Sequence, residues 1–111
     1  MSLRKLEKNE WETYFDNVSR HLKAATAEIE VAGLNLGDQV EAEWVPLVGI
    51  TYDPKDDLVE VATETVDHLV RHPSAIYVDD GTGGLHSVEI TDDEGNQHIV
   101  RLKAPLALPE P

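Results

Sequence analysis

Apolar and polar residues alternate most clearly in the middle of the chain, over residues 39–57. Val40, Ala42 and Trp44 are separated by polar residues, which is the two-residue period of a strand with one face on a core and the other in water. An almost continuous apolar run follows over residues 45–50, broken by one proline and one glycine, which weaken regular strand pairing. The pattern therefore predicts a long strand with a bulge or bend in its second half.

This strand ends in a turn, and a second strand returns from it. Residues 54–57 read PKDD, a loop of ordinary hairpin length with proline and aspartate at turn positions. The register follows from the pattern, because a slip of one residue would turn every side chain to the wrong face. We expect Tyr52 to face Val59 and Ile50 to face Val61.

A helical period near the N-terminus predicts an amphipathic helix over residues 9–25. Asn9 can cap this helix, with Glu12 three residues later in the position of a capping box. Its apolar residues follow at helical spacing: Trp11, Tyr14, Phe15, Val18 and Leu22. We interpret this stripe as the face that packs on the core rather than as a groove for a partner.

The remaining chain, residues 27–103, reads mainly as strands. Alternation predicts strands at 27–32, 75–78, 85–91 and 97–102, the last two joined as a hairpin. Between them, the spacing of Val66, Leu69 and Val70 suggests a short helix over residues 64–71 that stops before Pro73. Residues 104–111 are rich in proline, and we expect an extended tail there.

Together these elements predict an α+β fold in a single domain over residues 1–111. The N-terminal amphipathic helix would pack on an antiparallel sheet of about five or six strands, with the short helix inserted between strands. Such a sheet could also curl into a small barrel. A chain of 111 residues suits one core, and we find no internal repeat or linker.

The net charge of the chain limits the classes of partner that it can bind. Nine basic and 22 acidic residues give a formal net charge of −13, while 41% hydrophobic content argues against disorder. Such a surface repels phosphates and anionic lipid, so we expect neither nucleic acid nor membrane as a partner. Crowded carboxylates also suggest that mild acidification would stabilise the fold.

The absence of cysteine excludes disulfides and thiolate metal sites. No apolar run approaches the roughly 20 residues that span a bilayer, and the N-terminus lacks the apolar centre of a signal peptide. We therefore expect a cytoplasmic protein.

Short motifs in the central stretch carry a family resemblance. They are GDQVEA at residues 37–42, PL at 46–47 and GITYDPK at 49–55. With these motifs the chain resembles an uncharacterised bacterial family known only as a domain of unknown function, and the similarity covers nearly the whole chain. The resemblance implies a single-domain bacterial protein and supplies no activity, cofactor or catalytic residue.

Two histidines form the best candidate for a metal site. His68 and His72 are spaced i, i+4, so on a helix they could jointly bind zinc or nickel, with Glu64 one turn earlier as a third ligand. On the helical wheel this face lies opposite the apolar residues and points into solvent. Because Leu69 occupies the glutamate position of an H-E-x-x-H motif, a general base is missing, and an ordinary exposed face is the simpler reading.

The other candidate groups do not form a catalytic constellation. In the final hairpin Ile90 would oppose His98, which separates His98 from His86 by roughly 13 Å. The glycine-rich loop at residues 80–84 follows two aspartates and precedes a strand, unlike a phosphate loop. We therefore predict no catalytic residue and no cofactor.

Three functions stay open from the sequence. We favour a non-catalytic interaction module that binds a basic protein or forms a homo-oligomer through an exposed sheet edge or the apolar segment 46–50. The second is a metal-binding protein or metal-dependent enzyme using His68 and His72. The third is an acidic mimic of nucleic acid that binds a basic protein.

Overall fold

The computed structural model describes residues 3–33 and 37–109. In this part of the chain one α-helix and a short 3-10 helix accompany eight strands. Their bounds are β1 Arg4–Lys5, the 3-10 helix Lys8–Glu10, α1 Trp11–Arg20, β2 Thr26–Gly33, β3 Gly37–Asp53, β4 Leu58–Thr63, β5 Asp67–Arg71, β6 Pro73–Asp79, β7 Leu85–Asp92 and β8 Gln97–Leu106.

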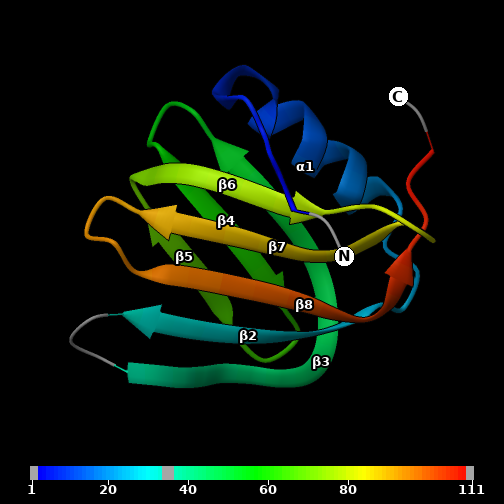
Figure 1. Ribbon diagram of the computed structural model, residues 1–111. Helices are drawn as coiled ribbons and strands as arrows, with labels where there is room; N and C mark the ends of the chain where they lie inside the picture. Colours follow the sequence, from blue (N-terminus) through cyan, green and yellow to red (C-terminus); the bar gives the residue numbers. More distant parts are fainter. Residues whose placement is uncertain (1–2, 34–36, 110–111) are drawn as a thin grey trace.

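All eight strands form one antiparallel sheet in the order β1-β6-β7-β8-β2-β3-β4-β5. The sheet curls into a half-barrel with α1 packed on its inner side (Figure 1). The expected α+β fold with about five or six strands is therefore wrong, since the described chain is mostly strand with one short helix. The sequence pattern missed β1, which is only two residues long, and misassigned β5.

The short helix expected over residues 64–71 is a turn followed by strand β5. The Thr63 hydroxyl accepts a hydrogen bond from the Val66 amide (2.9 Å) and donates one to the Val66 carbonyl (2.8 Å), which reverses the chain after β4. In β5, Val70 is 1% exposed and Leu69 is 41% exposed, so neighbouring side chains alternate between core and solvent. The apolar spacing of this segment fits the helical period as well as the strand period. Pairing with β4 makes it a strand.

The N-terminal helix is shorter than the expected span of residues 9–25. A capping box between Glu7 and Glu10 starts the preceding 3-10 turn, in place of a cap at Asn9. Trp11, Phe15 and Val18 are buried, so the prediction that the apolar stripe faces the core is confirmed.

The predicted hairpin register is confirmed. Tyr52 pairs with Val59 and Ile50 pairs with Val61. A register shift lies between Leu47 and Gly49, where the proline and glycine predicted a bulge. The first half of β3 pairs with β2 and the second half with β4, so this strand carries the sheet around the bend seen in Figure 1.

One helix residue replaces a strand partner for β3. The Ser19 hydroxyl donates to the Ile50 carbonyl (2.7 Å) and accepts from the Ile50 amide (3.0 Å). Because Ile50 pairs with Val61 on its other side, Ser19 satisfies the backbone groups that point away from β4. The helix thus covers the edge of the second half of β3.

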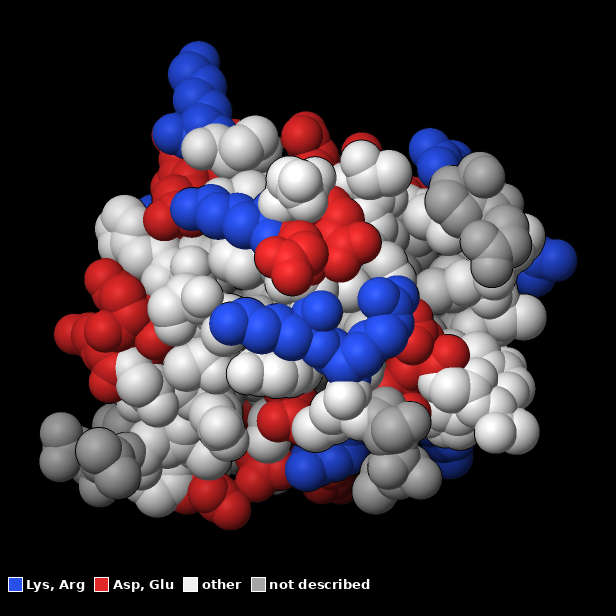
Figure 2. All heavy atoms as spheres, turned by 45° about the horizontal axis from the view of Figure 1, so that its top comes forward, with Lys and Arg blue, Asp and Glu red and all other residues white. Residues whose placement is uncertain are grey.

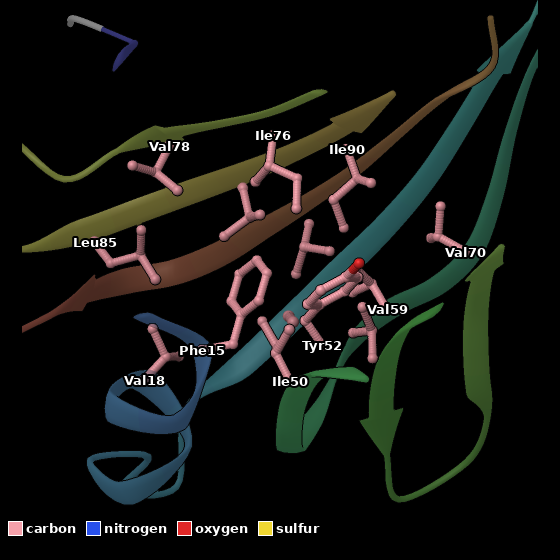
Figure 3. Close-up of a cluster of buried hydrophobic side chains, with 14 of the residues drawn as sticks. Phe15, Val18, Ile50, Tyr52, Val59, Val70, Ile76, Val78, Leu85 and Ile90 are labelled. Carbon is pink, nitrogen blue, oxygen red and sulfur yellow. The ribbon is translucent and has the colours of Figure 1, made fainter. Parts of the chain in front are cut away.

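The core lies between the two walls of the half-barrel. Figure 3 shows Phe15 reaching from α1 into the space between Leu85 of β7 and Ile50 of β3. The Trp11 and Tyr52 rings meet edge to face with centroids 5.1 Å apart. Strand β8 continues past residue 103, where the extended tail was expected to follow, and pairs Leu106 with Leu85. No helix in residues 3–33 and 37–109 is long and apolar enough to cross a membrane.

Candidate functional site

The first half of β3 has a strand partner on one side only. Residues 37–46 pair with β2, with register shifts that leave Glu41, Glu43 and Trp44 without a partner residue, and pairing with β4 begins at Leu47. On the other side of residues 38–45, the described part of the chain places no strand. We call this side of residues 38–45 the open edge; it lies at the bottom of the sheet in Figure 1.

Acidic and apolar side chains share the open edge. Asp38, Glu41 and Glu43 are exposed, and so are Val40 (53%) and Trp44 (39%). Such a surface offers unpaired backbone groups together with negative charge and apolar area, which suits an extended basic polypeptide. By contrast, the segment 46–50, the other contact surface suggested by the sequence, places only Val48 in solvent (60%), since Leu47 and Ile50 are buried.

A groove of about 620 Å³ begins at Trp44 and runs over the outer face of the sheet. Trp44 adopts a left-handed backbone conformation (φ 51°), which is strained for a tryptophan. The Lys103 ammonium lies over its ring, 6.0 Å from the centroid. Arg101 lies in the groove and donates to Glu28 (3.1 Å) and Glu30 (2.7 Å). The groove therefore combines an aromatic wall with one arginine that is held by two glutamates.

Two histidines and an aspartate form a hydrogen-bonded chain where β5 meets β8. His68 Nε2 lies 2.8 Å from His98 Nδ1, and His98 Nε2 lies 2.9 Å from Asp92 Oδ2. The Asp92 carboxylate also accepts from the amides of Glu94 and Asn96, both at 2.9 Å. The side chains of His98 and Asp92 are only 10% and 11% exposed, so this is a fixed and largely buried arrangement.

The protonation of this chain follows from its partners. Burial alone would raise the pKa of Asp92, but hydrogen bonds from His98 and from the Asn96 and Glu94 amides lower it below its usual range. Asp92 is therefore an acceptor, and His98 must donate from Nε2. Burial, followed by the charge that His98 can carry, lowers the pKa of His68. The two facing nitrogens can thus share one proton or one ion.

The three residues proposed from the helical wheel do not share a face, because their segment is a turn and a strand. His68 lies opposite Val61, whereas His72 follows β5, with Nδ1 3.4 Å from Asp57 Oδ2. Residues four apart on a strand are separated by about 13 Å. The Glu64 amide donates to the Pro46 carbonyl in the turn. In the described residues, no three His, Asp or Glu side chains converge on one metal position.

The pairing of His68 with His98 was missed by reasoning from the sequence. The predicted register of the final hairpin is confirmed near its turn, where Ile90 lies opposite His98, but a register shift follows between Ser87 and Leu85. The histidine on the same hairpin, His86, instead contacts the Thr82 carbonyl through Nε2 (2.6 Å). No local signal connects residues 68 and 98, because only the curl of the sheet brings β5 over β8.

A second polar cluster joins β1, α1 and the end of β6. The Asp80 carboxylate accepts from the Arg4 guanidinium (2.7 and 3.0 Å) and from the Tyr14 hydroxyl (2.9 Å). These bonds, led by that of Arg4, hold the pKa of Asp80 below its usual range. All three residues line a groove of about 310 Å³, but their polar groups are already hydrogen-bonded to one another. We interpret the cluster as a structural tie.

The carboxyl groups with a shifted pKa lead to the opposite prediction for acid stability from the one drawn from charge crowding. Lys and Arg side chains lie among acidic and uncharged ones on the upper face of the molecule (Figure 2). Asp80 pairs with Arg4, and Glu28 and Glu30 pair with Arg101. The carboxyl groups with a shifted pKa are all shifted downward: Glu30, Asp57, Asp80 and Asp92. Their protonation in acid therefore favours the unfolded chain.

Comparison with known proteins gives two matches and one negative result. The chain is 45% identical to an uncharacterized protein of Aquifex aeolicus (strain VF5), over 99% of this chain and 100% of that relative. No solved structure matched the chain. The model of a family of unknown function, DUF5335, matches residues 2–111. The chain therefore belongs to the DUF5335 family of unknown function, in agreement with the resemblance of its central motifs.

Proposed function

We propose that this protein is a binding module that takes up a basic, extended polypeptide segment along the open edge of β3. The observation that carries the proposal is the one-sided pairing of residues 38–45, which leaves backbone donors and acceptors facing solvent beside exposed Val40 and Trp44. An added strand would satisfy these groups, and side chains on alternate positions would supply specificity.

Charge favours a basic partner over a second copy of the chain. Antiparallel pairing of two open edges would bring Asp38, Glu41 and Glu43 of each copy close to those of the other, and like charges at cross-strand positions destabilise a sheet. The same residues also protect the edge against indiscriminate pairing. A partner with Lys or Arg at these positions turns that repulsion into attraction.

The groove beside Trp44 offers a place for a long basic side chain of the partner. Asp79 lines this groove and is 4% exposed. A lysine ammonium or arginine guanidinium would fit both the carboxylate and the face of the indole.

The test uses a short synthetic peptide of alternating lysine and valine as a probe. Nuclear magnetic resonance titration of the untagged protein should shift the amide signals of residues 38–45 most strongly. Reversing two edge charges, Glu41→Lys with Glu43→Lys, should weaken binding by about tenfold or more. A matched control, Glu12→Lys with Asp16→Lys on the exposed face of α1, changes the net charge equally and should retain most of the affinity.

Two results would overturn the proposal. Equal losses in both double variants would mean that the peptide responds only to net charge, as an acidic mimic of nucleic acid would allow. A stable dimer by light scattering that Glu41→Lys with Glu43→Lys abolishes would show that the edge binds a second copy instead.

A further inference from the structure

We propose that His68 and His98 form a binding site for one divalent transition-metal ion that prefers imidazole nitrogen, such as Zn²⁺. The site differs from the set of His68, His72 and Glu64 that the helical wheel suggested. It rests on the contact between β5 and β8 and is independent of peptide binding at the open edge.

The spacing of the two imidazoles fits a shared ion. His68 Nε2 and His98 Nδ1 are 2.8 Å apart, with ring centroids 5.0 Å apart and planes inclined by 50°. Two nitrogens bound to tetrahedral zinc, each at a bond length of about 2.05 Å, lie about 3.3 Å apart. A small rotation of the partly exposed His68 ring would therefore open enough space.

An outer carboxylate already sets the tautomer that a ligand needs. Asp92 accepts the Nε2 proton of His98 (2.9 Å), so the Nδ1 lone pair of neutral His98 points at His68. Backbone amides of Glu94 and Asn96 fix Asp92 in turn. A carboxylate bonded to the far nitrogen of a histidine ligand is the common arrangement around protein-bound zinc, and it holds the ring in place.

The surroundings give access to the site from the side of His98. A hollow of about 410 Å³ is lined by His98 and Asp92, but not by His68. Because no third His, Asp or Glu of the described residues converges on the two nitrogens, the remaining ligands of the ion would have to be water.

The experiment is a Zn²⁺ titration of the untagged protein by calorimetry, after removal of metal with a chelator. We expect one ion per chain. His68→Ala and His98→Ala should each weaken binding by about tenfold or more, and Asp92→Asn by about tenfold to a hundredfold, the usual effect of losing an outer partner. The matched controls His72→Ala and His86→Ala should leave the affinity unchanged.

A second measurement keeps the test decisive if His98→Ala does not fold. Long-range ¹H–¹⁵N spectra of the wild-type imidazoles should show Zn²⁺ shifting His68 Nε2 and His98 Nδ1, while His72 and His86 stay unchanged. The proposal is overturned if the protein binds no Zn²⁺, or if binding survives His68→Ala. The short contact would then be a hydrogen bond from His68 to His98.

Discussion

Replacement of Ser19 by alanine tests how the helix closes the sheet. The Ser19 hydroxyl is the partner of both the amide and the carbonyl of Ile50, at 3.0 and 2.7 Å, and Ile50 is 1% exposed. Water has little access to these groups, so Ser19→Ala would leave a buried donor and a buried acceptor without partners. Each such loss costs about 1 to 1.5 kcal/mol, which gives about 2 to 3 kcal/mol of unfolding free energy.

The assay is urea unfolding followed by the fluorescence of Trp11, which is 3% exposed in the folded protein. For a chain of this length the loss corresponds to a fall in Tm of about 10 °C. The slope of the unfolding free energy against urea concentration should stay unchanged. Ser74→Ala is the matched control, because that hydroxyl also bonds two backbone carbonyls, those of Thr91 and Asp92, but is exposed. It should cost less than about 0.5 kcal/mol. If Ser19→Ala costs no more than Ser74→Ala, the view that Ser19 replaces a strand partner is wrong.

Two further predictions concern acid stability and chain packing. The pKa of Asp80 is lowered in the folded state, so the stability it contributes is present above about pH 4 and is lost as the pH falls through the folded pKa. Asp80→Asn should therefore lower the urea midpoint at neutral pH and reduce its fall on acidification; a parallel fall in both proteins would contradict this. Gly84 has φ +122°, and a Cβ there would collide with the Leu106 carbonyl, so Gly84→Ala should cost more than about 2 kcal/mol, whereas Gly37→Ala, with open space around it, should cost less.

Local patterns predicted those features that depend on neighbours in the sequence. The register of the Ile50–Val61 hairpin follows from alternation and a short loop, and the core face of α1 follows from the spacing of Trp11, Phe15 and Val18. Both are fixed by side-chain period, because burying the wrong face would expose every apolar residue of the element.

Where a pattern fits both the helical and the strand period, only tertiary contacts decide which element forms. Val66 and Val70 suit one turn of helix as well as a strand, and the edge of β4 was available for pairing, so the segment became β5. The structure has more strands than the sequence predicted for a similar reason. The two residues of β1 are too few to show a period in the sequence, but they still pair with β6.

By itself, then, the sequence determined where the chain alternates, where it turns and which faces are apolar, because these depend on residues close in the chain. Only the tertiary structure decided that the sheet curls until β5 meets β8, which places His68 against His98, 30 residues later. It also decided that α1 covers the second half of β3 on the side away from β4, while the first half stays open on the opposite side, away from β2. Those outcomes depend on the curvature of the whole sheet, which no short stretch of sequence encodes.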